Sequence, residues 1–230
     1  MRRYLNLIVT SLSLVACSRP EAQPAAHSPA DASAKADQNE RLADATELLK
    51  AVPSGIAEPV LKRARCVAVV PGLLSGGLIV GGRHGNGFAT CRAADGWSAP
   101  APITISGASV GPQIGLQSVD LVMVVMTDEG LKKMLRAKLA LGADMSVSAG
   151  PVGKGREVDT DAALRAEALS YSRSRGLFAG VELNGAALEQ NEAATVALYG
   201  QPVAFQRLLT GEVPIPSEAH RFVEAVGETF

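Results

Sequence analysis

The chain of 230 residues is long enough for one domain with a sizeable buried core. Its 22 Lys and Arg residues almost balance its 23 Asp and Glu residues, and the net charge of −1 excludes the strongly basic surface of a general nucleic-acid-binding protein. Aromatic residues make up only 4% of the chain, which argues against a platform for stacking bases, and three His with three Cys leave little material for metal or nucleophile chemistry.

The first seventeen residues have the pattern of an export signal. Arg2 and Arg3 precede a mostly apolar stretch, residues 5–15, which is too short to span a membrane as a stable helix. The stretch ends in Leu14-Val15-Ala16-Cys17, which resembles a bacterial lipobox, where the Cys thiol receives a diacylglycerol before cleavage. We therefore expect residues 1–17 to be a lipoprotein signal peptide with Cys17 as the lipidated residue. The alternative is an ordinary signal peptide with an incidental Cys.

The residues after Cys17 indicate in which membrane the lipoprotein is anchored and how its domain is connected to the anchor. Several acyl chains on one terminus exceed the two signals needed for stable anchoring, and Ser18 in place of an Asp favours the outer membrane, again by resemblance. We expect a lipid-anchored protein of the cell envelope that faces the periplasm or the cell surface. Residues 18–38 are rich in Ala, Pro and Ser without apolar periodicity, which predicts a disordered linker, and residues 39–230 are expected to form a single domain.

The folded part opens with a predicted helix over residues 40–52, whose apolar stripe of Leu42, Ala45 and Leu49 ends before Pro53. Apolar runs then predict strands at residues 66–70, within 76–89, at 103–110 and at 120–126. The last of these runs is continuously apolar, as a strand buried on both faces would be.

Two Cys residues remain after the predicted signal, Cys66 and Cys91, and they fall on neighbouring predicted strands. In an exported protein this arrangement predicts a disulfide bond. The alternative is a pair of buried free thiols.

Asp128 is expected to cap a helix that carries Leu131, Met134, Leu135 and Leu139 on one face. The opposite face carries the cations Lys132, Lys133 and Arg136. Such a face can meet anionic lipid headgroups, at about 1 kcal/mol for each cation near the surface. The alternative is an ordinary solvated face of a surface helix. Nearby in the chain, glycine-flanked Leu73, Leu74, Leu78 and Ile79 are candidates either to enter a bilayer or to fill the core.

Residues 141–149 alternate apolar and small polar residues with a strict period of two, which predicts another strand. Further strands are expected at 166–173 and 177–183, a short helix at 191–198 and an amphipathic helix at 217–230. Seven or eight strands with few helices predict an α+β fold with a curved, mostly antiparallel sheet or partial barrel, flanked by several amphipathic helices.

The glycine-rich segments 82–87 and 150–155 contain fragments of nucleotide-binding motifs, but neither leads into a helix. Turn glycines explain both, so nucleotide binding is rejected. His84 and His220 have no second candidate ligand three or four residues away, and no G-x-S-x-G, H-E-x-x-H or C-x-x-C motif occurs. We expect no catalytic residue, no metal and no cofactor. A Ser–His–acid triad assembled from distant residues is the alternative.

Over residues 42–200 the chain resembles the SYLF-domain family. The matching segments are Pro53-Ser54-Gly55-Ile56, Leu61-Lys62-Arg63-Ala64, Cys66-Val67-Ala68-Val69-Val70-Pro71, Gly76-Gly77, Gly81-Gly82, Gly85-Asn86-Gly87, Trp97-Ser98-Ala99-Pro100, Gly111 with Gln113 and Gly115, Asp120-Leu121-Val122, Gly150-Pro151-Val152-Gly153 and Tyr171-Ser172-Arg173-Ser174-Arg175-Gly176-Leu177-Phe178-Ala179-Gly180-Val181. The last block is quite specific.

The resemblance implies binding of membrane lipids without catalysis. Eukaryotic members of the family bind phosphoinositides, in part through a basic amphipathic segment before the domain, and some bind actin filaments. Here the corresponding helix carries Glu40, Asp44 and Glu47 against Arg41 and Lys50, so it is not basic. An envelope lipoprotein is instead expected to meet phosphatidylglycerol, cardiolipin or phosphatidic acid. The family supplies no lipid-contact residues for this sequence, so Lys132, Lys133 and Arg136 depend on helix geometry alone.

The leading hypothesis is therefore a non-catalytic envelope lipoprotein whose domain binds anionic phospholipid on a second surface, with no nucleic-acid partner. The main rival is a structural or interaction module that binds an envelope protein or peptidoglycan, with the lipid anchor only locating it. A third hypothesis is an unrecognised hydrolase.

Overall fold

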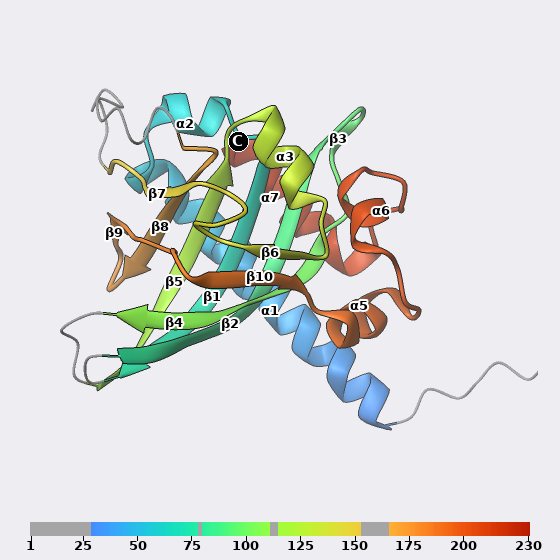
Figure 1. Cartoon of the computed structure of the whole chain (residues 1–230). Helices are drawn as coiled ribbons and strands as arrows, with labels where there is room; N and C mark the ends of the chain where they lie inside the picture. Colours follow the sequence, from blue (N-terminus) through green and yellow to red (C-terminus); the bar gives the residue numbers. More distant parts are fainter. Residues whose placement is uncertain (1–28, 78–79, 111–114, 153–165) are drawn as a thin grey trace, which may run out of the picture.

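The fold combines one strongly curved sheet with helices on both of its faces (Figure 1). The computed structural model describes residues 29–77, 80–110, 115–152 and 166–230. Its strands are β1 (Cys66–Gly77), β2 (Val80–Ala93), β3 (Gly96–Trp97), β4 (Ala101–Val110), β5 (Gly115–Val125), β6 (Lys138–Ala140), β7 (Val147–Ala149), β8 (Ala168–Ser174), β9 (Leu177–Gly180) and β10 (Ala186–Gln190). Its helices are α1 (Pro29–Gly55), α2 (Glu58–Lys62), α3 (Asp128–Met134), α5 (Glu192–Tyr199), α6 (Phe205–Leu209), the 3-10 turn η1 (Ser217–Ala219) and α7 (His220–Thr229).

The ten described strands form a single sheet in the order β6-β10-β4-β2-β1-β5-β8-β7, with β3 paired to β2 and β9 paired to β8. All pairs of strands are antiparallel except β7 with β8. The predicted α+β fold with a curved, mostly antiparallel sheet is confirmed.

Two apolar cores lie on the two faces of this sheet, which explains why β1 is continuously apolar over residues 66–70 and β5 over residues 121–125. On β1, Val67 and Val69 enter the core beneath α1 and α7, while Ala68 and Val70 enter the core inside the curl of the sheet. The first core contains the α1 stripe that the sequence predicted, with Leu42, Leu49 and Val52 all almost fully buried. In Figure 1, α1 crosses diagonally behind the sheet.

Helix α1 is longer than the sequence predicted, because it begins at Pro29. Residues 29–38 were expected in the disordered linker and are helical in the structure. Tertiary contacts explain the difference: Gln38 is buried, and the Lys35 ammonium lies 2.5 Å from the Glu218 carboxylate on η1. Residues 1–28, which include the predicted signal peptide, Cys17 and the first part of the linker, lie outside the described residues.

The period-two stretch at residues 141–149 is a strand only at Val147–Ala149. The chain turns before it, because Gly142 adopts a positive φ of 90° and the Asp144 N–H donates to the Ala140 carbonyl at 2.8 Å. The prediction of one continuous strand there was wrong, since alternation in sequence does not reveal a turn that a glycine permits. The C-terminal helix is present as η1 followed by α7.

Cys66 and Cys91 lie directly opposite each other on β1 and β2. Both residues are fully buried, and the structure joins their sulfur atoms in a disulfide bond. The bond is at the end of the β1–β2 pair that lies away from the β1–β2 turn.

Candidate functional site

The helix that carries the predicted lipid-binding cations is shorter than its sequence pattern indicated. Helix α3 ends at Met134, and Leu139, assigned from its spacing to the apolar face of the helix, lies on β6 opposite Leu188 of β10. Its N-cap is Thr127, whose side-chain oxygen accepts the Gly130 N–H at 3.0 Å, so the capping role given to Asp128 was wrong. Arg136 therefore follows the helix, in the turn before β6.

Lys132, Lys133 and Arg136 do lie within one short segment of the surface, but carboxylates neutralise much of its charge. The Lys133 ammonium lies 2.7 Å from the Glu167 carboxylate and is only 24% exposed. Lys132 lies 3.6 Å from Glu129, whereas the exposed Arg136 makes no ion pair with the described residues. Burial opposes ionisation of Glu167, yet hydrogen bonds from Lys133 and from the Ser146 N–H hold its pKa below the ordinary value. This segment is less cationic than its sequence suggests.

The described residues contain neither a group of side chains that could bind a metal ion nor a helix that could span a membrane. None of their His, Cys, Asp and Glu side chains gather in groups of three or more that could hold a metal ion. None of the described helices is both long and apolar enough to cross a bilayer. His84 and His220 are exposed and lie on different elements, β2 and α7.

A second surface lies at the end of the sheet formed by the last residues of β1, the first residues of β2 and β5, and the turn between β8 and β9. The strand register brings them together, because Gly77 of β1 is paired with Gly81 of β2 and with Gly115 of β5, while Asp120 of β5 is paired with Arg173 of β8. We call the described residues 74–77, 81–84, 116–120 and 173–177 the hairpin end. It lies at the left of Figure 1.

Large apolar side chains are exposed at the hairpin end. Leu74 is 43% exposed, Leu116 75% and Leu177 77%, and together they are three of the four large hydrophobic residues that are exposed in the described part of the chain. They come from three different strands. Exposed apolar side chains of this size mark a surface whose burial, against a membrane or a partner, lowers the free energy of the system.

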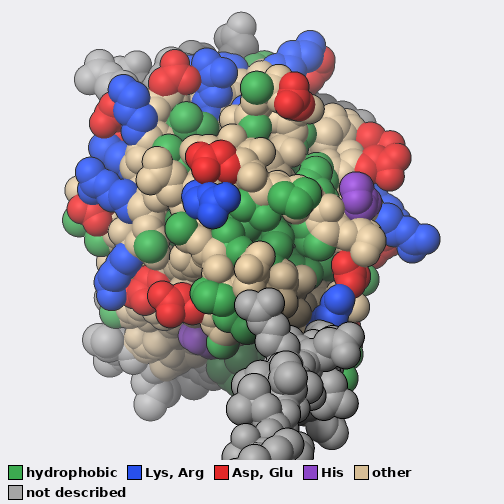
Figure 2. Space-filling view, turned by 90° about the vertical axis from the view of Figure 1, so that its right-hand side faces the viewer, with side chains coloured by type: hydrophobic (Ala, Val, Ile, Leu, Met, Phe, Trp, Pro, Cys, Tyr) green, Lys and Arg blue, Asp and Glu red, His purple; other side chains and the backbone are tan. Residues whose placement is uncertain are grey.

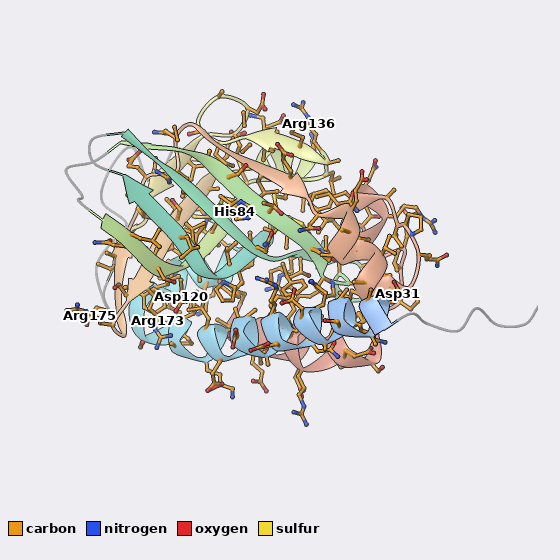
Figure 3. The ribbon with its side chains drawn as sticks, turned by 90° about the horizontal axis from the view of Figure 1, so that it is seen from below. Asp31, His84, Asp120, Arg136, Arg173 and Arg175 are labelled. Atoms are coloured by element: carbon orange, nitrogen blue, oxygen red, sulfur yellow. A yellow bond between two sulfur atoms is a disulfide. The ribbon has the colours of Figure 1, made fainter. Side chains whose placement is uncertain are left out.

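The hairpin end is also cationic. It carries Arg83, Arg173, Arg175 and His84, and its one carboxylate, Asp120, lies 3.5 Å from the Arg173 guanidinium and accepts the Gly72 N–H at 3.1 Å. Figure 3 shows Arg173, Arg175 and Asp120 together at this end, with His84 further along the sheet.

The three arginines differ in their surroundings. Arg83 is half-buried, donates to the Glu182 carbonyl at 2.9 Å, and has its guanidinium pKa lowered by burial. Arg175 sits in the β8–β9 turn with a φ of 48°, is exposed, and makes no ion pair within the described ranges.

A hollow of about 390 Å³ opens on the hairpin end. Its lining consists of Leu74, Gly76, Gly77, Gly82, Arg83, His84 and Leu116, a set that includes no carboxylate. The sequence analysis had considered Leu74 for membrane contact but missed Leu116, Leu177 and the arginines. One signal was available, because residues 66–119 contain no Lys or Glu and only three charged residues, Arg83, Arg92 and Asp95.

The face that carries α5 and α6 is different in character. Figure 2 shows hydrophobic side chains there, surrounded by charged side chains of both signs. A second hollow of about 420 Å³ lies between α5 and the segment that precedes α6, and its lining combines Val196, Pro202 and Val203 with the polar Gln190 and Glu192. Mixed charge around an apolar centre is typical of a surface for a protein partner.

Comparison with known proteins places this fold among eukaryotic relatives. A family model described as "Ysc84: Las17-binding protein actin regulator" matches residues 106–229. The chain is 35% identical over 164 residues to Protein YSC84 of Saccharomyces cerevisiae, a match that covers 70% of this chain and 35% of the yeast protein. It is 35% identical over 165 residues to LAS seventeen-binding protein 3 of the same organism, covering 70% and 36% of the two chains.

The match to the human SH3 domain-containing YSC84-like protein 1 is 34% identical over 169 residues and covers 72% of this chain and 48% of the human protein. The chain thus spans about a third to a half of the length of these relatives. No solved structure matches it significantly.

Proposed function

Since the chain belongs to the Ysc84 (SYLF-domain) family, we propose that its folded domain binds the surface of membranes that contain anionic phospholipids and performs no catalysis there. With the predicted lipid on Cys17, the protein would be held in the cell envelope by its N-terminus and would contact a second membrane surface through its domain. Phosphatidylglycerol, cardiolipin and phosphatidic acid are the proposed headgroups.

The observation that carries this proposal is the coincidence of exposed leucines and arginines at the hairpin end. Moving an exposed Leu side chain from water into the acyl region contributes up to about 2 kcal/mol. Each cation near an anionic surface adds about 1 kcal/mol. Leu116, Leu177 and Arg175 can contribute both terms at once, and the Asp120 carboxylate that would oppose them is already paired with Arg173.

The hairpin end and the α3 segment are competing locations for this contact. Helix α3 follows the last residue of β5, Val125, whereas the hairpin end contains its first residues. A strand of 11 residues extends about 3.4 Å per residue, so the two surfaces are separated by the length of β5. One flat bilayer therefore meets one of them, and the better-exposed charge and apolar area favour the hairpin end over Lys132 and Lys133.

The proposal is tested by co-sedimentation of the full chain, with Cys17→Ser to prevent lipidation, with vesicles of phosphatidylcholine alone or mixed with phosphatidylglycerol. We expect binding only to the anionic vesicles, weaker at high salt because salt screens the charges. Absence of binding to anionic vesicles at low salt would overturn the proposal.

A second candidate function, binding of an envelope protein partner, is favoured by the hollow between α5 and the segment before α6. It is also favoured by the description of the family model and by the name of LAS seventeen-binding protein 3, both of which state binding to Las17. In this case the lipid anchor only locates the domain. Site-specific photocrosslinkers at Val196 and at Leu116 would separate the two functions in cells. Protein adducts from Val196 support the partner, and lipid adducts from Leu116 support membrane binding.

A further inference from the structure

We infer that the hollow at the hairpin end seats one acyl chain of an anionic membrane phospholipid. The inference depends on the proposed function, since it assigns a ligand to the surface proposed to contact the membrane. It goes further because a seated chain is held in a defined place on the protein, whereas leucines that merely enter a bilayer hold no particular lipid.

The strand register shows how the hollow is built. Ala108 of β4, Gly82 of β2, Gly76 of β1 and Leu116 of β5 lie side by side in one row across four strands. The next row contains Ser106, His84, Leu74 and Ser118. Directly paired residues, and residues two apart on a strand, point to the same face of a sheet. Gly76 and Gly82 thus form the floor, with Leu116 at one end and Leu74 along one side, and Ala108 continues the row beyond the lining.

The glycines of β2 differ in what the fold requires of them. A Cβ atom on Gly81 or Gly87 would overlap backbone atoms of β1, and one on Gly85 would lie 2.8 Å from side-chain atoms of Leu73 and Val70. These glycines are explained by close packing. A Cβ atom on Gly82 would meet no described atom closer than the Gly107 carbonyl oxygen, at 3.9 Å.

Packing against the described residues therefore gives no reason for a glycine at position 82. Neither does backbone conformation, because Gly82 is not among the residues of positive φ. The consequence of its missing side chain is an open floor, and a glycine inside a strand often marks a place where a ligand approaches closely.

The hollow is an extension of the apolar face that α1 covers elsewhere. Along β2, Phe88, Asn86, His84 and Gly82 share this face. Phe88 is fully buried in the core beneath α1, and Asn86 lines a smaller hollow beside α1, but His84 and Gly82 are exposed. The sheet continues past the edge of its covering helix and offers an apolar chain the same surface that α1 occupies in the core.

The residues that line the hollow at the hairpin end indicate which kind of ligand it can hold. Its apolar wall is formed by Leu74 and Leu116, and His84 shares their face of the sheet. Arg83 adjoins the hollow from β2, but its side chain alternates to the other face and donates to the Glu182 carbonyl. A volume of about 390 Å³ lies within the range of small-ligand sites. A linear hydrocarbon chain fits a glycine floor between leucines, and the lining holds no carboxylate that would repel a headgroup of negative charge.

The test uses the full Cys17→Ser chain and two probes, dihexanoyl-phosphatidylglycerol below its micelle concentration and phosphatidylglycerol vesicles. Methyl NMR signals of Leu74 and Leu116 report seating of the monomeric lipid. Gly82→Leu fills the floor and is expected to weaken binding of the monomer by about tenfold. Ala108→Leu fills the adjoining position on the same row and is expected to do the same. Gly82→Ala, which adds one methyl group into open space, is the matched control and should stay close to the parent.

The outcomes separate the two claims. Loss of monomer binding in both filled variants, with vesicle binding retained, supports the acyl seat. If the parent binds vesicles but not the monomer, or if the filled variants bind the monomer as well as the parent does, the acyl seat is overturned and membrane binding stands. If the parent binds neither probe, both are overturned. Unchanged thermal midpoints confirm that the variants fold.

Discussion

Gly55, the last residue of α1, lies so close to Phe178 of β9 that a Cβ atom on the glycine would overlap the phenyl ring. Phe178 packs against the core beneath α1, which contains Val52 and Ile56 from either side of the glycine. The contact joins the first and the last segments through which the sequence resembles its family. It fixes the end of α1 against the outer edge of the sheet.

Replacing Gly55 by Ala is therefore expected to destabilise the fold by about 1–3 kcal/mol, because the added methyl group forces the ring or the helix to move. Urea denaturation followed by circular dichroism measures the change. Gly82→Ala is the matched control, since its methyl group enters open space, and its stability should change by less than about 1 kcal/mol. Equal stabilities of the two variants would contradict the close contact.

Acid should weaken the docking of α1 on η1. Hydrogen bonds from Lys35, from its own backbone N–H and from Ser217 lower the pKa of Glu218 from 4.5 to about 2. A carboxylate with a depressed folded pKa stabilises the protein fully above its unfolded pKa, and this contribution is lost as the pH falls from about 4.5 toward 2. Glu218→Gln should thus be less stable than the parent at pH 7 and lose less stability on acidification to pH 3. Identical pH profiles would show that the pair contributes nothing.

Charge reversal distinguishes the two competing membrane surfaces, because two single variants can be compared that have the same net charge. Arg175→Glu at the hairpin end and Arg136→Glu beside α3 change the protein by the same amount, and both side chains are exposed. We expect Arg175→Glu to weaken binding to anionic vesicles by about 2 kcal/mol, or about thirtyfold, and Arg136→Glu to have little effect. The reverse order would move the site to α3.

Tryptophan fluorescence can show which face enters the bilayer. The only native Trp, Trp97, is 9% exposed, so its emission serves as a steady background. A Leu116→Trp variant should shift its emission to the blue with anionic vesicles and be quenched by brominated acyl chains. Val196→Trp, on the face of α5, is the control, and a larger shift there would favour that face instead.

The two internal cysteines give a simple chemical prediction. Because the structure joins Cys66 and Cys91, the exported protein should show no alkylation at either residue when it is denatured without reductant. Mass spectrometry after iodoacetamide treatment measures this, and a reduced sample that gains two labels is the control. Labelling of the unreduced sample would show that the thiols are free.

Runs of apolar residues in the sequence correctly predicted strands, because strand formation and burial depend mainly on neighbouring residues in the chain. The continuous apolar run at residues 120–126 indicated a strand buried on both faces. In β5, Val122 and Val124 do enter one core, and Leu121, Met123 and Val125 enter the other. Leu139 shows where such reasoning ends. Its spacing from Leu135 fits a helix, but pairing with Leu188 of β10 draws it into the sheet, and a long-range pairing leaves no mark on local periodicity.

The candidate site was missed for the same reason. Leu74 and Leu116 are far apart in sequence and share one face of the sheet only because of the register of β1 with β5, while Leu177 lies at the same end of the sheet on the opposite face. The charge of α3 was overestimated because Glu167, which pairs with Lys133, comes from a distant segment. The sequence around a single leucine or lysine does not show whether the leucine will be buried or which carboxylate will pair with the lysine.

The position of the disulfide has a mechanical consequence for the proposed contact between the hairpin end and a bilayer. Cys66 and Cys91 hold β1 and β2 together at the base of their hairpin, at the far end from Leu74 and Gly82. The two strands are then covalently fixed to each other at one end and are free to bend at the other. A force on the free end therefore bends β1 and β2 together, because the disulfide prevents them from separating at the other end. The paired residues at the free end keep their register while the force acts.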